Sequence, residues 1–272
     1  MRKIKYRLIV SDFDGTLVKR DTTIGELSKQ AIAEYIKNGG NFALSSGRMP
    51  SSIRRRAQEL GLKGIVCAYQ GSVIMDIESG KVYSEGKLDY DLALDACKYF
   101  EEKGVHFHLY DFDKFYSNID DEPLHLYAKA TGEDAIVNPR LSEFMQETGF
   151  APYKMLVMVE PQDLIPTYND LMERYGDKCY VTCSSRHFVE LCNKNYSKGT
   201  AIAYLMNHFG VSKEESMAIG DQINDLPMLK SVGFGIAVKN CQEQLKKEVL
   251  VFDYTNEEDA VGRAIEKFAY ID

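Results

Sequence analysis

Long apolar runs, paired cysteine motifs and an excess of basic residues are all absent from this sequence of 272 residues. No stretch approaches the roughly 18 consecutive apolar residues of a membrane span, and the run Leu8–Val10 is too short for a signal peptide. We therefore expect a cytoplasmic protein with no membrane partner. The six cysteines lack C-x-x-C spacing, which favours buried, reduced thiols.

The net charge of −8 disfavours a nucleic-acid partner, because a phosphate backbone demands a basic surface. It does not exclude a small phosphorylated ligand, since lysine and a metal ion can reverse the field inside one cleft. The apolar fraction of 44% and the charged fraction of 27% are typical of globular proteins. The length allows one large domain or two modest ones, with a sizeable core.

Strand and helix signals alternate at both ends of the chain, which predicts a parallel sheet with right-handed crossovers. We expect strands at 6–11, 41–45, 64–68, 216–219, 234–238 and 249–252, and helices at 26–38, 51–60, 199–209, 224–231, 241–247 and from 257. A hairpin is expected over 72–84.

The middle of the chain follows another pattern, in which strands neighbour one another and helices are interspersed. This pattern predicts a separate α+β module inserted into the first one. We therefore predict an α/β fold: residues 1–85 and 191–272 form a doubly wound parallel sheet, and residues 86–190 form an inserted α+β cap domain.

The most informative motif is Asp12-Phe13-Asp14-Gly15-Thr16, which follows the first expected strand. Two carboxylates two positions apart, where a strand opens into a glycine turn, suit a nucleophile and a proton carrier, and can also hold one hard cation. An EF-hand calcium loop is disfavoured, because its twelfth position would be Thr23 and not glutamate.

Three further segments gain meaning beside this motif. Ser46-Gly47 offers a hydroxyl and an open backbone N–H, although a serine helix cap is the ordinary explanation. Lys198 begins a helix, where a lysine is usually a solvated charge. The segment Gly220–Asp225 crowds two acids and an amide into one turn, which is unfavourable unless a cation lies between them. All are expected where ligands bind in parallel sheets, at the carboxyl ends of the strands.

The order and spacing of these motifs resemble the haloacid dehalogenase superfamily of aspartate-nucleophile phosphotransferases. More narrowly, they resemble Cof-type phosphatases with an inserted type IIB cap. The resemblance spans nearly the whole chain and implies a phosphatase that acts on a small soluble phosphate ester and requires Mg²⁺. Three features depart from the family pattern: Gln70 stands where asparagine is common, Ser46 stands where threonine is commoner, and Met49 separates Arg48 from the proline.

The resemblance also implies a role for each motif residue. Asp12 would be the nucleophile that forms an aspartyl-phosphate, and Asp14 the general acid and base. Mg²⁺ would be held by the Asp12 carboxylate, the Asp14 backbone carbonyl and Asp221, with Asp225 supporting the site. The phosphoryl group would be held by Ser46, the Gly47 amide, Lys198 and Asn224, with the Phe13 amide nearby.

Two alternatives to a phosphatase remain open. A phosphomutase of the same superfamily would use the same two aspartates but release little phosphate. A sensor of phosphorylated ligands without catalysis is less favoured, because all four acids are present. Sugar phosphates, flavin mononucleotide and pyridoxal phosphate all stay open as substrates.

Two other motifs have simpler interpretations. Asp111 and Asp113 repeat the D-x-D spacing, but lysine and phenylalanine follow instead of glycine and threonine, so we predict a hairpin turn. His106 and His108 could form half of a zinc site, yet no third ligand is evident in sequence, and packing on one face of the cap sheet is favoured.

Overall fold

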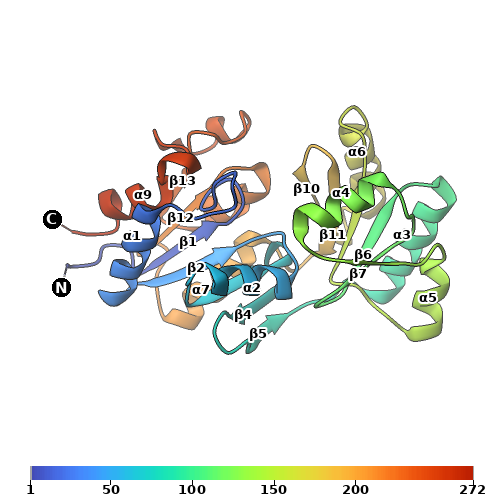
Figure 1. Ribbon diagram of the computed structural model, residues 1–272, viewed down its shortest axis with the longest axis horizontal. Helices are drawn as coiled ribbons and strands as arrows, with labels where there is room; N and C mark the ends of the chain where they lie inside the picture. Colours follow the sequence, from blue (N-terminus) through green and yellow to red (C-terminus); the bar gives the residue numbers. More distant parts are fainter. Residues whose placement is uncertain (1, 272) are drawn as a thin grey trace.

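Two β-sheets form the centres of two lobes in the computed structural model, which describes residues 2–271 (Figure 1). The larger sheet has eight strands, in the order β14 (Leu250–Val251), β13 (Phe234–Ala237), β12 (Ser216–Gly220), β1 (Leu8–Asp12), β2 (Asn41–Ser45), β3 (Ile65–Ala68), β4 (Val73–Asp76) and β5 (Val82–Glu85). The strands from β14 to β3 are parallel, and β4 and β5 are antiparallel additions at one edge.

The strand order reverses beside β1. The chain first runs outward from β1 to β5, and later returns to place β12, β13 and β14 on the other side of β1. In an open parallel sheet, such a switch point opens a crevice at the carboxyl ends of the strands. The doubly wound sheet predicted from the sequence is therefore confirmed.

Helices cover both faces of this sheet, which explains why all five residues of β1 are buried. On one face, Ile9 packs with residues of α1 (Glu26–Lys37), α2 (Pro50–Glu59) and α9 (Ala260–Phe268). On the other face, Leu8 and Val10 pack with residues of α7 (Lys198–Phe209) and α8 (Leu226–Ser231). Alternate residues of one strand thus serve two cores, and β1 is fixed from both sides.

The smaller sheet lies in the other lobe (Figure 1). Its six strands are β10 (Cys179–Ser185), β11 (Phe188–Asn193), β9 (Lys154–Met158), β6 (Phe107–Tyr110), β7 (Phe115–Ser117) and β8 (Ala135–Val137). The helices of this lobe are α3 (Tyr90–Lys103), α4 (Glu122–Thr131), α5 (Leu141–Thr148) and α6 (Leu164–Tyr175). Side chains of α3, α5 and α6 pack on one face of the sheet, around Leu109, Met155 and Leu191.

The opposite face of the smaller sheet belongs to a core that both lobes share. Tyr110 and Leu156 join the buried cluster that surrounds β2 and β3. The Tyr69 ring, just after β3, lies 5.8 Å from the Tyr110 ring and 6.0 Å from the Tyr153 ring. The face of the smaller sheet that bears Tyr110 and Leu156 therefore packs against the end of the larger sheet.

The chain crosses between the lobes twice, and the two crossings lie side by side. The Tyr196 hydroxyl donates to the Glu85 carbonyl (2.9 Å), and the Asn193 side-chain amide donates to the Lys87 carbonyl (2.6 Å). Gly86 lies so close to the Tyr196 ring that a Cβ would be 2.0 Å from it, so only glycine fits. Hydrogen bonds thus join the outgoing and returning segments.

Most predicted elements are confirmed within a few residues, with two exceptions. The expected helix at 241–247 is wrong: only a short 3-10 turn, Leu245–Lys247, forms there. The segment instead binds the loop after β12, because Gln242 donates its backbone N–H to the Asp221 carbonyl and accepts from the Ile223 N–H through Oε1. The short edge strand β8 was not predicted.

Three smaller expectations concern the domain boundary, membrane-spanning helices and the cysteines. The expected boundary between residues 190 and 191 falls inside β11, whose last residues pair with β9 and β10, so we propose that the inserted segment continues to Asn193. No helix in residues 2–271 has the length and apolar character needed to cross a membrane. All six cysteines are free, as predicted, and five are buried, but Cys183 is only partly buried.

The two histidines of the smaller sheet hydrogen-bond one another. His106 Nε2 lies 3.0 Å from His108 Nε2, and His106 Nδ1 lies 3.1 Å from Asp121. His108 Nδ1 lies 3.2 Å from the Tyr110 hydroxyl. Neither histidine belongs to a group of three converging metal-ligating side chains in the part of the chain that the structure describes. Hydrogen bonds within the sheet and with Asp121, the N-cap of α4, therefore account for both rings.

This environment predicts sensitivity to acid. Burial lowers the pKa of His106, and burial together with His106 and Lys154 lowers the pKa of His108 well below 6.5. A lowered pKa gives stability that is present above the ordinary value and is lost as the pH falls, because the unfolded chain then binds more protons. The His108→Asn variant should therefore lose less unfolding free energy than the wild type between about pH 7.5 and about pH 5.5. Urea titrations at the two pH values measure the loss of unfolding free energy in the variant and in the wild type.

The exposed His125 offers a matched control, and His125→Gln should retain the wild-type loss. An unchanged loss in His108→Asn would contradict the prediction.

Candidate active site

The predicted functional residues meet at the carboxyl ends of β1, β2 and β12. Eight of the nine line one cavity of about 230 Å³; they are Asp12, Asp14, Ser46, Gly47, Lys198, Asp221, Asn224 and Asp225. The ninth, Phe13, is fully buried between the two aspartates of its motif. The convergence expected from the strand order is thus present in the structure.

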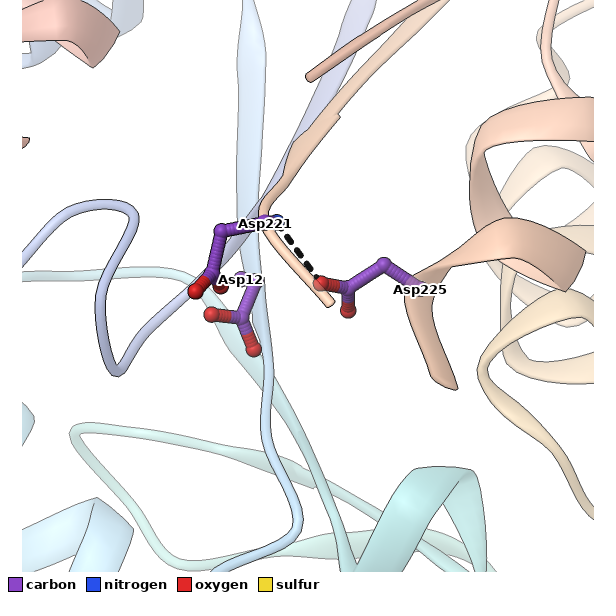
Figure 2. A group of neighbouring side chains, drawn as sticks. All are labelled: Asp12, Asp221 and Asp225. Carbon is purple, nitrogen blue, oxygen red and sulfur yellow. Dashed lines mark hydrogen bonds between the residues drawn. The ribbon is translucent and has the colours of Figure 1, made fainter. Parts of the chain in front are cut away.

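Three buried carboxylates form the centre of the site (Figure 2). Oxygens of Asp12, Asp221 and Asp225 lie within 4.8 Å of one another, and this is the only such group of acidic or metal-ligating side chains in residues 2–271. Asp12 ends β1, Asp221 follows β12, and Asp225 ends the 3-10 turn Ile223–Asp225. Residues more than 200 positions apart are adjacent because β1 and β12 are paired strands.

A single ammonium group lies within this cluster. Lys198 Nζ lies 2.6 Å from Asp12 Oδ1 and 2.6 Å from Asp225 Oδ1. The lysine is 1% exposed, so it is not the solvated charge that a lone lysine usually is. Ser197 starts α7 with a capping box that it shares with Thr200, and this places Lys198 in the first turn, directed at the carboxylates.

The carboxylates differ in the oxygen atoms that they leave free. Asp225 uses both: Oδ1 accepts from Lys198, and Oδ2 accepts from the backbone N–H groups of Asp221 (2.9 Å) and Gln222 (3.0 Å). Asp12 Oδ2 is buried and has no hydrogen-bond partner. Asp225 therefore organises the cluster, whereas Asp12 has an oxygen free to bind a cation or to attack an electrophile.

The glycine turn after β1 explains the remainder of the first motif. Gly15 has a φ of +81°, and a Cβ there would lie 2.6 Å from Asp221 Oδ2. The hydroxyl of the next residue, Thr16, donates to Asp221 Oδ1 at 3.0 Å. Gly15 thus allows the loop after β1 to lie against the loop after β12, and the hydroxyl of Thr16 orients Asp221.

Crowding shifts the ionisation of these groups. Burial, opposed by Lys198, raises the pKa of Asp12 well above its usual range. Burial and the neighbouring Asp225 raise the pKa of Asp221 to about 7. Burial opposes the charge of Lys198, but Asp12 and Asp225 outweigh it and raise the pKa of that ammonium. Three acids around one ammonium therefore leave uncompensated negative charge, which a divalent cation would neutralise.

Asp14 is held by a residue to which the sequence assigned no role. Arg48 Nε donates to Asp14 Oδ2 and Arg48 Nη2 donates to Asp14 Oδ1, both at 2.7 Å. The Asp14 side chain is 48% exposed, so it stands at the cavity mouth while Asp12 lies at its base. This bidentate pair fixes the second aspartate in one orientation.

Ser46 is not a helix cap. Helix α2 starts at Pro50 with Met49 as its N-cap, so Ser46 lies outside the helix. Its Oγ accepts from the Arg48 backbone N–H at 3.1 Å, which leaves its hydroxyl hydrogen free to donate into the cavity. Space beside Gly47 is limited, since a Cβ there would lie 2.7 Å from Gln70 Nε2.

Gln70 and Asn224 form a bridge across the site. Asn224 Nδ2 donates to Gln70 Oε1 at 3.1 Å, and Asn224 Oδ1 is buried with no partner. Gln70 is fully buried, and both it (φ 58°) and Tyr69 (φ 48°) occupy the left-handed region. Such backbone strain is tolerated where the fold needs a side chain in one place. The departure at residue 70 thus lies in the site itself.

The smaller lobe supplies the far wall of the same cavity, and sequence reasoning missed this half. The wall includes Tyr127 of α4 and, from the smaller sheet, Lys154, Ser184, Phe188 and Glu190. One signal could have found two of them: Lys154 begins the apolar run of β9, and Glu190 interrupts that of β11. Charged residues in buried strands are uncommon and favour a functional explanation.

Comparisons with known proteins agree with this geometry. The sequence profile of the haloacid dehalogenase-like hydrolase family matches residues 9–265. The phosphatase YwpJ of Bacillus subtilis is 26% identical over 278 residues, covering 94% of this chain and 97% of that protein. A haloacid dehalogenase-like hydrolase from Bacteroides thetaiotaomicron is similar in structure, with a TM-score of 0.81 and 29% identity over 97% of this chain and 99% of that one.

A third comparison concerns the fold alone. The sugar phosphatase BT4131, of haloacid dehalogenase subclass IIB, superposes with a TM-score of 0.82 over 96% of this chain and 98% of its own, at 18% identity.

The carboxylate cluster predicts a metal response that depends on pH. A cation needs ionised carboxylates, and the raised pKa of Asp221, about 7, means that binding must displace a proton at lower pH. Without metal, the raised pKa gives stability that is lost as the pH rises through that value. Added Mg²⁺ should therefore raise the melting temperature more at about pH 8 than at about pH 6.

Thermal unfolding with Mg²⁺ or with a chelator measures this difference. Asp221→Asn should remove most of the Mg²⁺ effect at both pH values. A wild-type melting temperature that ignores Mg²⁺ at about pH 8 would contradict the metal assignment.

Proposed function

The chain belongs to the family of haloacid dehalogenase-like hydrolases, and we propose that it is a Mg²⁺-dependent phosphatase that hydrolyses a small phosphate monoester through an aspartyl-phosphate on Asp12. The observation that carries the proposal is the buried Asp12 carboxylate: one oxygen is held by Lys198, and the other has no partner. This suits a nucleophile that is positioned by one atom and reacts through the other.

The residues of the site fit a divalent cation, because three buried carboxylates share one ammonium. Asp12, Asp221 and the backbone carbonyl of Asp14 would hold Mg²⁺, with Asp225 supporting the cluster. When bound, the ion supplies positive charge to the phosphoryl oxygens.

The chain offers several donors to a phosphoryl group. Ser46, Gly47, Lys198 and Asn224 all line the cavity, and they offer a hydroxyl, a backbone N–H, an ammonium and a side-chain amide. The Phe13 N–H belongs to the same loop as Asp12. Donors in fixed positions stabilise charge that develops on equatorial oxygens without reorganising during the reaction.

Asp12 would begin the reaction by attacking phosphorus through Oδ2. A bond forms between Asp12 Oδ2 and phosphorus, the bond between phosphorus and the ester oxygen breaks, and the departing oxygen takes a proton from Asp14. In the second step, water gives its proton to Asp14 and attacks the phosphoryl group, which releases phosphate and regenerates the Asp12 carboxylate.

Arg48 determines when Asp14 can serve as an acid. Both Asp14 oxygens accept from Arg48 in this structure, so at least one of these bonds must open before Asp14 can carry a proton to the leaving group. We therefore assign Arg48 the role of orienting Asp14 between turnovers.

We propose that residues 86–193, with the smaller sheet, form the cap of this enzyme. The cap contributes one wall of the cavity, so it would contact the leaving group and exclude water while the aspartyl-phosphate forms. A cavity of about 230 Å³ fits a small phosphate ester, such as a sugar phosphate or a compact phosphorylated cofactor.

A phosphate-release assay over a panel of phosphorylated metabolites tests the reaction. The wild type should release phosphate from at least one ester, and a chelator should abolish the release. Asp12→Asn should fold normally and lose at least about 10³-fold in kcat, because the amide cannot form the covalent intermediate. Little net release together with a requirement for a bisphosphate would favour the phosphomutase. Substantial turnover by Asp12→Asn would overturn the nucleophile assignment.

Asp14→Asn should separate the two aspartates. Its kcat should fall by about 10²–10⁴-fold, since an amide at this position cannot pass a proton to the leaving oxygen. Because the nucleophile is intact, an ester with an activated leaving group, such as p-nitrophenyl phosphate, should still give a burst of nitrophenol. Stopped-flow absorbance measures that burst. Equal losses in the rate of the burst phase for activated and unactivated esters would contradict the acid role of Asp14.

A further inference from the structure

A buried ion pair in the smaller sheet faces the proposed phosphoryl site. Lys154 Nζ, on β9, lies 3.0 Å from Glu190 Oε1, on the neighbouring strand β11, and each side chain is 3% exposed. The Lys154 ammonium also lies 4.4 Å from the centre of the Tyr110 ring. The mechanism above uses neither charge, although both residues line the cavity.

The pair is one part of a hydrogen-bond chain that crosses between the lobes. Lys154 Nζ donates to the Gly47 carbonyl at 3.1 Å. Gln70 Nε2 donates to Glu190 Oε2 at 3.0 Å, and Asn224 Nδ2 donates to Gln70 Oε1 at 3.1 Å. This chain of hydrogen bonds thus begins at Gly47 and ends at Asn224. Both are proposed phosphoryl ligands, and they lie on different loops of the larger sheet.

Glu190 determines which group donates and which accepts in the hydrogen bonds that run from it through Gln70 to Asn224. An ionised carboxylate only accepts, so the Gln70 amide must present its NH₂ group to Glu190 and its oxygen to Asn224. Asn224 must then present its NH₂ group to Gln70. The charge of one residue in the smaller sheet therefore fixes the orientation of two side-chain amides in the other lobe.

Stability does not explain why this pair is present. Burying two charges costs free energy that their attraction often fails to return, and apolar residues of similar size are frequently as stable or more stable. Ser184 also donates to Glu190 Oε1 at 2.8 Å, so Oε1 accepts two hydrogen bonds and Oε2 accepts one, from Gln70. A charged pair that is paired on every side and faces a cavity is better explained by a task at that cavity.

We propose that Lys154 and Glu190 are positioning residues, whose ion pair completes the phosphoryl site by fixing Gly47 from one side and Asn224, through Gln70, from the other. The inference rests on the proposed function of the same site. Both charges belong to the smaller sheet, so the phosphoryl ligands reach their final positions only while that sheet covers the larger one. The cap thereby governs the chemistry and does not merely cover it.

The decisive variant replaces both charges together. Lys154→Met/Glu190→Leu removes the ion pair from the chain of hydrogen bonds and fills the same volume with apolar side chains. The melting temperature of this double variant should equal or exceed that of the wild type. Its Kd for inorganic phosphate, measured by calorimetry in the presence of Mg²⁺, should rise at least about 10-fold, and kcat/KM should fall by about 10²-fold, because small displacements of positioned groups have effects of this size.

Two further variants accompany it. Gln70→Met keeps the ion pair but cuts the bond to Asn224, and should also weaken phosphate binding. Ser142→Ala is the matched control: Ser142 donates to Glu101 on the far side of the smaller sheet, and its loss should leave the Kd for phosphate and kcat unchanged.

The outcomes separate this inference from the proposed function. If the wild type releases phosphate from an ester but the double variant binds phosphate as tightly as the wild type, the positioning role is wrong and the phosphatase stands. If the wild type binds phosphate but hydrolyses no ester, while the double variant loses that binding, the phosphatase is wrong and the positioning role stands. Equal losses in the control and the double variant would also overturn the inference.

Discussion

The two short bonds from the Lys198 ammonium to Asp12 and Asp225 are the interaction on which the site depends. They join the end of β1, the loop after β12 and the first turn of α7, three segments that are distant in sequence. Without a cation, the three buried carboxylates would repel one another at a place where water cannot screen them. The fold can therefore crowd these acids together only because the same site provides positive charge.

The two lobes contribute different kinds of chemistry. The larger sheet provides the charged centre, in which Asp225 is saturated, Asp221 is oriented by Thr16, and Asp12 keeps one oxygen free. The smaller sheet provides hydroxyl, aromatic and paired charged groups on the opposite wall. In the proposed function, reactivity therefore depends on residues that the strand order brings together, whereas the choice of leaving group depends on the wall that the smaller lobe contributes.

The sequence predicted the parts of the molecule that local patterns determine. Alternating strands and helices indicated the doubly wound sheet, and the D-x-D-G-T and G-D-x-x-N-D motifs located the acids, because each motif occupies one strand end. Contacts between the lobes escaped prediction, since no local pattern links Lys154 to Gly47 or Glu190 to Gln70. Similarly, the expected helix near residue 245 failed because Gln242 is engaged by the loop after β12, a contact that depends on the folded sheet.

The paired crossings between the lobes have a mechanical consequence. Residues 85–87 and 193–196 are tied to one another by hydrogen bonds and by the close contact of Gly86 with the Tyr196 ring, so they behave as one narrow seam and not as two independent tethers. Because the two crossings are joined, any opening of the cavity would turn the smaller lobe about this one seam. The far rim of the cavity would then travel further than the residues beside the seam.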